Sequence, residues 1–213
     1  MSRHKLQRFE EMKSFPNAFE YPVEMKGRWR RDFFKNDNPL VLELGCGRGE
    51  YSIALSGMYP EKNFIGIDLK GARLWKGAKT CLQLHHTNAA FIRSRIELIE
   101  HYFEAGEVDE IWITFPDPQP KDRWEPRRLT ANNYLAIYRK ILKKEGIIHL
   151  KTDNTGLYEY TLEVIKTNGY ELLYNHPDIY SLPEIEPILT VETTYEKIFK
   201  AKGETIKYIK FRI

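Results

Sequence analysis

The chain has 213 residues, of which 42% are hydrophobic and 30% are charged. This length indicates one domain with appendages, or at most two small domains, and the composition excludes disordered and collagen-like proteins. Because 33 lysines and arginines stand against 30 acidic residues, the net charge is only +3 and any strongly basic surface must be local.

Cysteine content and hydropathy indicate the compartment. Cys46 and Cys81 are too few for a disulfide framework and match no zinc-site spacing, which is typical of a reducing environment. No apolar run approaches the ~18 residues that a membrane span needs, and residues 1–31 are charged where a signal peptide would be apolar. We therefore expect a cytoplasmic protein without membrane contact.

The first 37 residues are locally basic. They include nine lysines and arginines, which suggests a basic N-terminal arm (1–37) in front of a folded domain (38–213). Such an arm favours contact with a nucleic-acid backbone. The alternative is a solvated tail without a partner.

Apolar runs with strand composition follow the arm, and helical patterns separate them. The runs are 40–44, 64–67, 89–92, 111–115 and 146–150. Strands that alternate with helices form βαβ units, so we predict an α/β fold with a parallel sheet and helices on both faces. After Gly169 strand-like runs follow one another directly, at 170–174, 190–199 and 205–213, which predicts an antiparallel edge.

Two helices have the clearest periodicity. Apolar residues recur every three or four positions in 134–142 and again in 157–166. Thr130 and Thr155 are suitable N-caps for them, and Gly169 is placed to end the second.

A glycine-rich turn, with Gly45, Gly47 and Gly49, joins the run 40–44 to the first helix. In a doubly wound sheet ligands bind beyond the carboxyl ends of the strands, and glycines let the backbone approach a ligand closely. A dinucleotide-binding turn would have its third glycine where Glu50 stands, so this turn does not match that motif.

Two carboxylates near the turn select a ligand. Glu43 would repel a pyrophosphate and attract an ammonium group, whereas Asp68 ends the second strand, where an acid chelates ribose hydroxyls. S-adenosylmethionine carries both a ribose diol and a cationic amino-acid end. The alternatives are a nicotinamide dehydrogenase and a glycine turn without a ligand.

A stiff loop follows the run 111–115. Pro116, Pro118 and Pro120 fix φ at alternate positions and exclude helix and central strand. The loop therefore holds Asp117 at the carboxyl edge of the sheet, next to the expected cofactor site. A tight turn with a solvated acid is the alternative.

Basic side chains and one aromatic residue come next, and this composition suits phosphates and a stacked base. The residues are Lys121, Arg123, Trp124, Arg127 and Arg128. An ordinary charged loop would look similar. Asp153 lies beyond the run 146–150 on the same rim, although Asp153 or Asn154 also suits a helix cap.

Four segments together carry a family resemblance: Glu-Leu-Gly-Cys-Gly-Arg-Gly at 43–49, Phe-Pro-Asp-Pro-x-Pro-Lys at 115–121 with Arg-Arg-Leu-Thr at 127–130, Lys-Thr-Asp-Asn at 151–154, and Thr-x-Tyr-Glu at 193–196. The chain resembles the tRNA (guanine-N(7)-)-methyltransferase family over roughly residues 20–200. The glycine turn is common to many methyltransferases, whereas the proline loop in order with the other segments is specific to this family.

The resemblance implies a Rossmann-like class I methyltransferase fold with a mostly parallel, seven-stranded sheet. It implies methyl transfer from S-adenosylmethionine to a ring nitrogen of a guanine in the tRNA variable loop, with S-adenosylhomocysteine as the product and no metal. By analogy the cofactor site includes Glu43, Gly45, Gly47, Asp68, Arg95, Ile96 and Asp117, the last also being the candidate catalytic residue. The tRNA would contact Lys121, Arg123, Arg127, Arg128, Asp153, Thr193, Thr194, Tyr195 and Glu196.

The chain departs from the family pattern at Arg95, Gln119 and Trp124, which bears on the adenine contact and the stacking partner. A methyltransferase of another RNA, a protein or a small molecule is the first alternative. A non-catalytic RNA-binding subunit is the second, and either a monomer or a homodimer fits the sequence.

Overall fold

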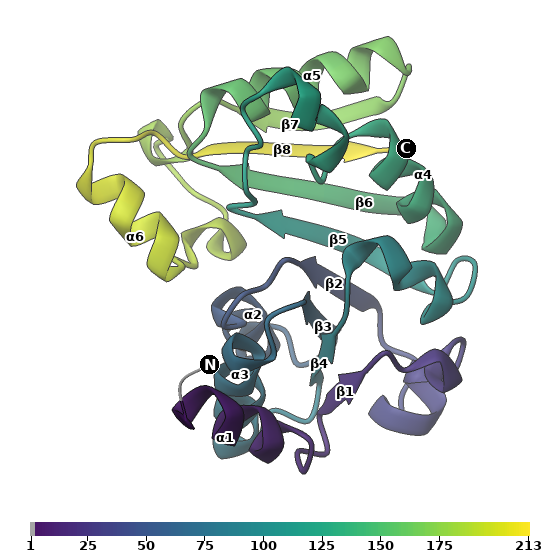
Figure 1. Ribbon diagram of the computed structural model, residues 1–213. Helices are drawn as coiled ribbons and strands as arrows, with labels where there is room; N and C mark the ends of the chain where they lie inside the picture. Colours follow the sequence, from purple (N-terminus) through teal and green to yellow (C-terminus); the bar gives the residue numbers. More distant parts are fainter. Residues whose placement is uncertain (1–2) are drawn as a thin grey trace.

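The computed structural model describes residues 3–213 and shows an α/β fold around one eight-stranded sheet (Figure 1). The strands lie in the order β1-β4-β3-β2-β5-β6-β8-β7. β8 runs antiparallel to both β6 and β7, and the other pairings are parallel, as predicted. The strands are β1 (Ala18–Glu20), β2 (Leu40–Leu44), β3 (Asn63–Asp68), β4 (Ala89–Arg93), β5 (Val108–Thr114), β6 (Leu142–Thr152), β7 (Glu171–His176) and β8 (Lys207–Arg212).

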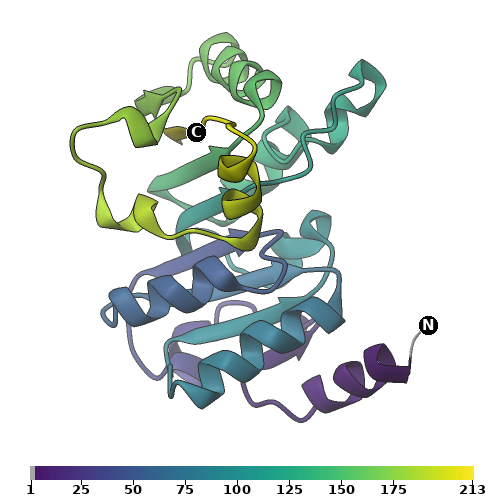
Figure 2. The ribbon, with the colours of Figure 1, turned by 90° about the vertical axis from the view of Figure 1, so that its left-hand side faces the viewer.

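Helices cover both faces of the sheet because side chains alternate across it along each strand. Leu42 on β2 and Ile111 on β5 face the core under α4 and α5, whereas Val41 and Trp112, one position away, face the core under α2. Figure 2 shows α2 and α3 side by side on the second face. The α-helices are α1 (Arg3–Met12), α2 (Glu50–Met58), α3 (Gly71–Gln83), α4 (Asn132–Ile141), α5 (Thr155–Thr167) and α6 (Thr194–Ala201).

Three expectations are corrected. The sheet has eight strands rather than seven, because Ala18–Glu20 pairs with β4 at one edge. The run 190–199 is not a strand: it forms the end of a short 3₁₀ helix (Pro187–Thr190) and most of α6. The N-caps of α4 and α5 are Ala131 and Asn154 in place of Thr130 and Thr155, and the Asn154 side chain accepts the Leu157 N–H.

The segment expected to form a basic arm is packed against the rest of the protein along much of its length. Besides β1, it supplies a π-helix (Trp29–Phe34) whose Trp29 is fully buried and donates its indole N–H to the Tyr102 carbonyl. Glu11 on α1 accepts hydrogen bonds from Trp75 and Lys79 on α3. Met1 and Ser2, the first residues of that arm, lie outside the described residues. Within residues 3–213 no helix has the length and apolar character needed to cross a membrane.

Candidate functional site

Asp68, the last residue of β3, holds the glycine turn at the carboxyl edge of the sheet. Its Oδ2 accepts the Gly47 N–H at 2.9 Å and its Oδ1 accepts the Lys70 N–H at 2.7 Å. Gly45, Gly47 and Gly49 all have positive φ, at +72°, +57° and +70°, a conformation that glycine adopts without steric cost. The turn therefore depends on its glycines and on the Asp68 carboxylate.

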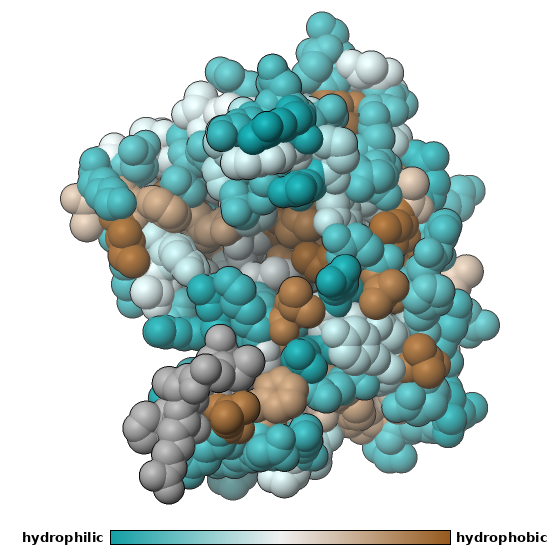
Figure 3. Space-filling view, viewed as in Figure 1, coloured by the Kyte–Doolittle hydropathy of each residue, from teal (hydrophilic) through white to brown (hydrophobic). Residues whose placement is uncertain are grey.

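A cleft of about 390 Å³ opens beside this turn. On the face shown in Figure 3, apolar side chains lie in the recessed middle of the molecule. Four residues predicted from the sequence for the cofactor site, Gly45, Asp68, Arg95 and Ile96, lie together in the wall of the cleft. Gly47 is tied to them through Asp68, whereas Glu43 and Asp117 are not among the lining residues.

Sequence reasoning missed four further lining residues, namely Leu69, Ser94, Glu97 and Tyr134. The Tyr134 hydroxyl donates to Glu97 Oε1 at 2.9 Å and so joins α4 to the 3₁₀ helix Ile96–His101, and burial raises the pKa of Tyr134 to about 12. Leu69 and Ser94 directly follow β3 and β4. Because ligands bind beyond the carboxyl ends of parallel strands, their sequence positions could have predicted a place in the cleft. Tyr134 showed only the pattern of a core residue.

Glu43 lies beneath the glycine turn and is only 4% exposed. Its Oε2 accepts both the backbone N–H and the hydroxyl of Ser52, and its Oε1 accepts the Thr114 hydroxyl at 2.8 Å. Ser52 is in the first turn of α2, where backbone N–H groups lack helical partners, so the carboxylate stabilises that helix start. Burial raises the pKa of Glu43 to about 7 despite these hydrogen bonds.

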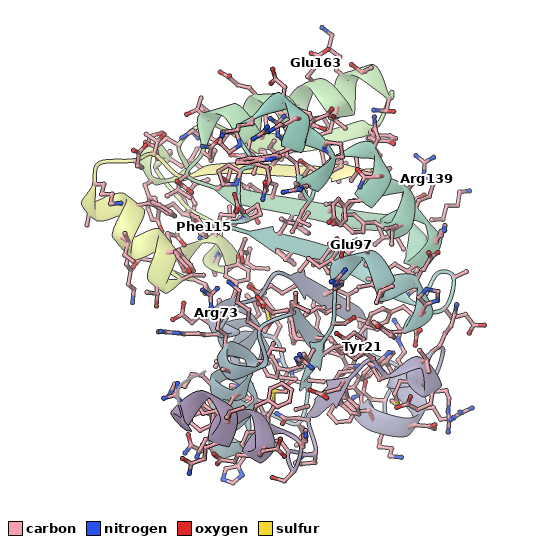
Figure 4. The ribbon with its side chains drawn as sticks, in the orientation of Figure 1. Tyr21, Arg73, Glu97, Phe115, Arg139 and Glu163 are labelled. Carbon is pink, nitrogen blue, oxygen red and sulfur yellow. The ribbon has the colours of Figure 1, made fainter. Side chains whose placement is uncertain are left out.

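The proline loop presents Asp117 to solvent at the end of β5. Phe115 and Gln119, on either side of it, have φ of +48° and +47°, which is unusual for residues with side chains. The Gln119 N–H donates to Asp117 Oδ1 at 3.2 Å. In Figure 4 Phe115 lies where β5 ends, near α6, and its ring stacks on Phe199 with 6.0 Å between ring centroids.

The basic segment after the loop forms a 3₁₀ helix (Asp122–Arg127). Lys121 and Arg123 are exposed, and their cations lie 4.7 and 5.5 Å from the centroid of the Trp124 ring. Arg127 is also exposed. Arg128 differs from them, because it is partly buried and its side chain contacts protein groups.

Asp153 lies on the same rim, directly after β6. Its carboxyl group is partly buried, and that burial raises its pKa. Its backbone carbonyl accepts the Lys207 ammonium at 2.8 Å, while Asn154 caps α5. Among residues 3–213 no three His, Cys, Asp or Glu side chains are grouped as a metal site requires.

The Thr-x-Tyr-Glu segment begins α6 and divides between surface and core. The Thr193 hydroxyl caps the helix by accepting the Glu196 N–H, and Thr194 donates its N–H to Glu50 at 2.7 Å. Tyr195 is 48% exposed, whereas Glu196 is fully buried. The Glu196 carboxylate accepts hydrogen bonds from Lys151 and, at 2.8 Å, from the Tyr180 hydroxyl, so its contacts lie within the protein.

Comparison with known proteins identifies the family. A family model described as "Putative methyltransferase" matches residues 37–209. The chain is 47% identical to the tRNA (guanine-N(7)-)-methyltransferase of Bacteroides thetaiotaomicron, over 100% of this chain and 87% of that protein. It is 49% identical to the enzyme of the same name from Porphyromonas gingivalis, over 94% of this chain and 86% of that protein.

Solved structures give the same fold at low sequence identity. The 16S rRNA methyltransferase KamB has a TM-score of 0.66 at 12% identity, covering 86% of this chain and 91% of KamB. An antibiotic-related methyltransferase has a TM-score of 0.63 at 16% identity, covering 86% and 92%. These two likenesses establish the class I methyltransferase fold alone. The family model and the relatives confirm the resemblance seen in the sequence: the chain belongs to the tRNA (guanine-N(7)-)-methyltransferase family.

Proposed function

We propose that this protein transfers the methyl group of S-adenosylmethionine to ring nitrogen 7 of a guanine in the variable loop of tRNA. One observation carries the proposal. At the carboxyl edge of one sheet, the structure has a cleft that contains Asp68, a stiff loop that exposes Asp117, and an exposed basic segment directly after that loop. Names of the relatives support the choice of substrate.

The cleft fits the nucleoside part of the cofactor. Its polar wall has the Asp68 carboxylate, whose oxygens can accept hydrogen bonds from ribose hydroxyls, and Leu69 and Ile96 offer apolar surface for a purine. Glu43 lies beneath the turn with an acidic group for the cationic end of the methionine part. The cofactor supplies an electrophilic methyl group on its sulfonium.

The protein has two chemical tasks at the acceptor. Guanine nitrogen 7 has an in-plane lone pair and needs no deprotonation, so no general base is required. Asp117 is held at the cofactor edge by the stiff loop, and its carboxylate suits the positive charge that develops on the purine. The fold orients the acceptor, a contribution of ~7 to 11 kcal/mol in favourable systems.

Guanine and tRNA recognition is assigned to side chains on the same rim. The Asp153 carboxylate can accept hydrogen bonds from the N1–H and the 2-amino group of guanine, which adenine lacks. Lys121, Arg123 and Arg127 are exposed for phosphates, with Trp124 and Tyr195 as aromatic surfaces. Binding should weaken with salt, by a log–log slope of ~0.7 per phosphate on single strands and ~0.9 on duplex. We further infer a cytoplasmic location, where tRNA is modified.

The test uses unmodified tRNA and S-adenosylmethionine with a labelled methyl group. After incubation the tRNA is digested to nucleosides, and we expect label in 7-methylguanosine from the variable loop. Label in another nucleoside, or turnover of a protein or small acceptor in the absence of RNA, would select the corresponding alternative. A tRNA whose variable-loop guanine is replaced by adenine is the matched control and should remain unlabelled.

A further inference from the structure

We propose that Arg128 is a positioning residue for this reaction: it fixes the conformation of the proline loop that presents Asp117, and it does not bind tRNA phosphate. The inference rests on the proposed function, in which Asp117 lies at the acceptor. The sequence motif and the basic neighbours of Arg128 had indicated a tRNA contact, so this role differs from the one predicted from the sequence.

The contacts of Arg128 lie within the protein. Its Nε–H donates to the Gln119 carbonyl oxygen at 3.2 Å, and its guanidinium carbon lies 4.3 Å from the centroid of the Tyr160 ring. Tyr160 is fixed in turn by donating its hydroxyl to Glu125 Oε1 at 2.6 Å. The guanidinium is thus held on one face by an aromatic ring and at one edge by a backbone acceptor, a pairing that its planar shape allows.

Gln119 is the residue through which this contact reaches Asp117. Its carbonyl accepts from Arg128 and its N–H donates to Asp117 Oδ1, so the two hydrogen bonds hold the two peptide groups that flank one α-carbon. That α-carbon has φ of +47°, the left-handed region that glutamine rarely adopts. Without Arg128, Gln119 can relax toward negative φ, and its N–H then turns away from the Asp117 carboxylate.

The backbone next to Arg128 is held by hydrogen bonds to other elements. The next residue, Leu129, gives its carbonyl to the Tyr138 hydroxyl at 3.0 Å, and the Thr130 hydroxyl pairs with that of Thr161 at 2.8 Å. A Leu129 side-chain carbon also lies 3.9 Å from the position of a Cβ on Gly45. The segment 128–130 therefore contacts the proline loop, the glycine turn and α5, which suits a positioning role.

Two other arginines provide contrasts. Arg127 is exposed and, among residues 3–213, makes no side-chain hydrogen bond or ion pair, so it is available to phosphate. Arg139 has a comparable aromatic contact, with its guanidinium carbon 5.4 Å from the centroid of the Tyr170 ring. Figure 4 shows Arg139 on α4, far from Phe115 at the end of β5, so it matches the chemistry of Arg128 at a site remote from the loop.

The experiment compares Arg128→Gln, Arg128→Lys, Arg127→Gln and Arg139→Gln in the full-length protein. We measure kcat and KM for tRNA, tRNA Kd at several salt concentrations, and Kd for S-adenosylmethionine. Both Arg128 variants should lose about tenfold or more in kcat, because lysine keeps the charge but lacks the planar donor. Their tRNA Kd and salt slope should stay within twofold of wild type. Arg127→Gln should instead raise the tRNA Kd and reduce the salt slope, and Arg139→Gln should change none of these values.

A second pair of variants guards against misfolding. Adding Gln119→Asn to Arg128→Gln should restore kcat several-fold, because asparagine tolerates positive φ better than glutamine does. A general loss of folding would not be reversed in this way. Tyr160→Leu, which retains Arg128 but removes the ring beneath it, should lower kcat in the same direction as Arg128→Gln.

Amide hydrogen exchange separates this inference from the proposed function. Arg128→Gln should speed exchange at residues 117 and 119 relative to Arg139→Gln, whatever the methyl acceptor is. If the wild type makes no 7-methylguanosine while this difference in exchange persists, the proposed function is wrong and the positioning role of Arg128 is retained. A raised tRNA Kd and a lower salt slope in Arg128→Gln but not in Arg128→Lys, with kcat at saturating tRNA retained in both, would overturn the inference in favour of a phosphate contact.

Discussion

Lys151 and Glu196 form an ion pair in which both side chains are fully excluded from solvent, with 2.8 Å between Nζ and Oε1. The Lys151 ammonium also donates to the carbonyls of Leu189 and Val191, at 2.7 and 3.0 Å. The Lys151 carbonyl accepts the Phe115 N–H at 2.8 Å. One residue at the end of β6 therefore holds both the start of α6 and the start of the proline loop.

Removing one partner of this pair should destabilise the protein strongly. Lys151→Met leaves the Glu196 carboxylate buried without its counter-ion, and such changes cost ~3 to 5 kcal/mol. Urea unfolding followed by circular dichroism measures the change in the free energy of unfolding. The matched control is Lys197→Met, because Lys197 follows Glu196 in α6 and is exposed. This variant should change the free energy of unfolding by no more than about 0.5 kcal/mol. Equal midpoints for the two variants would contradict the interpretation of the pair.

Cofactor affinity should depend on pH through Glu43. Because burial raises the pKa of Glu43 to about 7 in the free protein, its carboxyl group is largely protonated at pH 6 and largely ionised at pH 8. The cationic cofactor favours the ionised form, so binding releases a proton and the Kd should fall about fivefold or more from pH 6 to pH 7.5. Titration calorimetry at these pH values measures the effect. Glu43→Gln should flatten the dependence, and a Kd that rises with pH in the wild type would contradict it.

Asp68 should contribute directly to cofactor binding. Asp68→Asn removes the charge that accepts a ribose hydroxyl, and a charge-assisted hydrogen bond is worth ~1.5 to 3 kcal/mol, or about a ten- to a hundred-fold change in Kd. The same substitution disturbs the Gly47 contact, so thermal unfolding is recorded in parallel. Lys70→Ala is a useful comparison, since it keeps the backbone N–H that Asp68 accepts. We expect a change of less than threefold for that variant.

Asp117→Ala should reduce turnover far more than cofactor affinity. Asp117 is exposed on its loop and absent from the wall of the cleft, so the cleft stays intact when the carboxylate is lost. We expect kcat to fall by about a hundredfold or more, the range for loss of a preorganised charge, with the Kd for S-adenosylmethionine within about threefold of the wild-type value. Single-turnover methylation and equilibrium binding measure the two quantities. An equal loss in both would assign Asp117 to cofactor binding alone.

Single-turnover rates should change little with pH above the range in which carboxylates titrate. This follows because guanine nitrogen 7 attacks through a lone pair that carries no proton. The rate is measured at saturating cofactor and tRNA, which separates it from the Glu43 effect on affinity. A tenfold rise per pH unit through neutrality would instead require an essential general base.

The parts of the fold that the sequence predicts well are those in which local pattern and tertiary structure agree. The run 40–44 is β2, residue for residue, and the glycine turn and Asp68 meet as their spacing implies. The run 190–199 was wrongly predicted to be a strand because its β-branched and aromatic residues favour one. Thr193 and Glu196, however, have the Thr-x-x-Glu spacing that is typical of a helix start. That capping signal was present in the sequence. The three residues of β1 gave no comparable signal.

The burial and contacts of individual side chains were harder to predict than the helices and strands. From the sequence, all four residues of the motif at 193–196 were predicted to contact tRNA. In the structure Tyr195 is exposed, whereas Glu196 pairs with Lys151 in the core. Arg127 and Arg128 are chemically identical neighbours, and only the fold shows that one is exposed while the other contacts Tyr160. Such differences depend on contacts between distant segments, which composition and periodicity do not encode.

The place of β8 between β6 and β7 affects how the chain can acquire its structure. Among residues 3–213, β7 pairs with residues 207–212 alone, although it precedes them by about thirty positions in the sequence. During synthesis on the ribosome, β6 and β7 therefore have no shared neighbour until residues 207–212 emerge. This side of the sheet therefore forms only when residues 207–212 insert between two strands that precede them in the sequence.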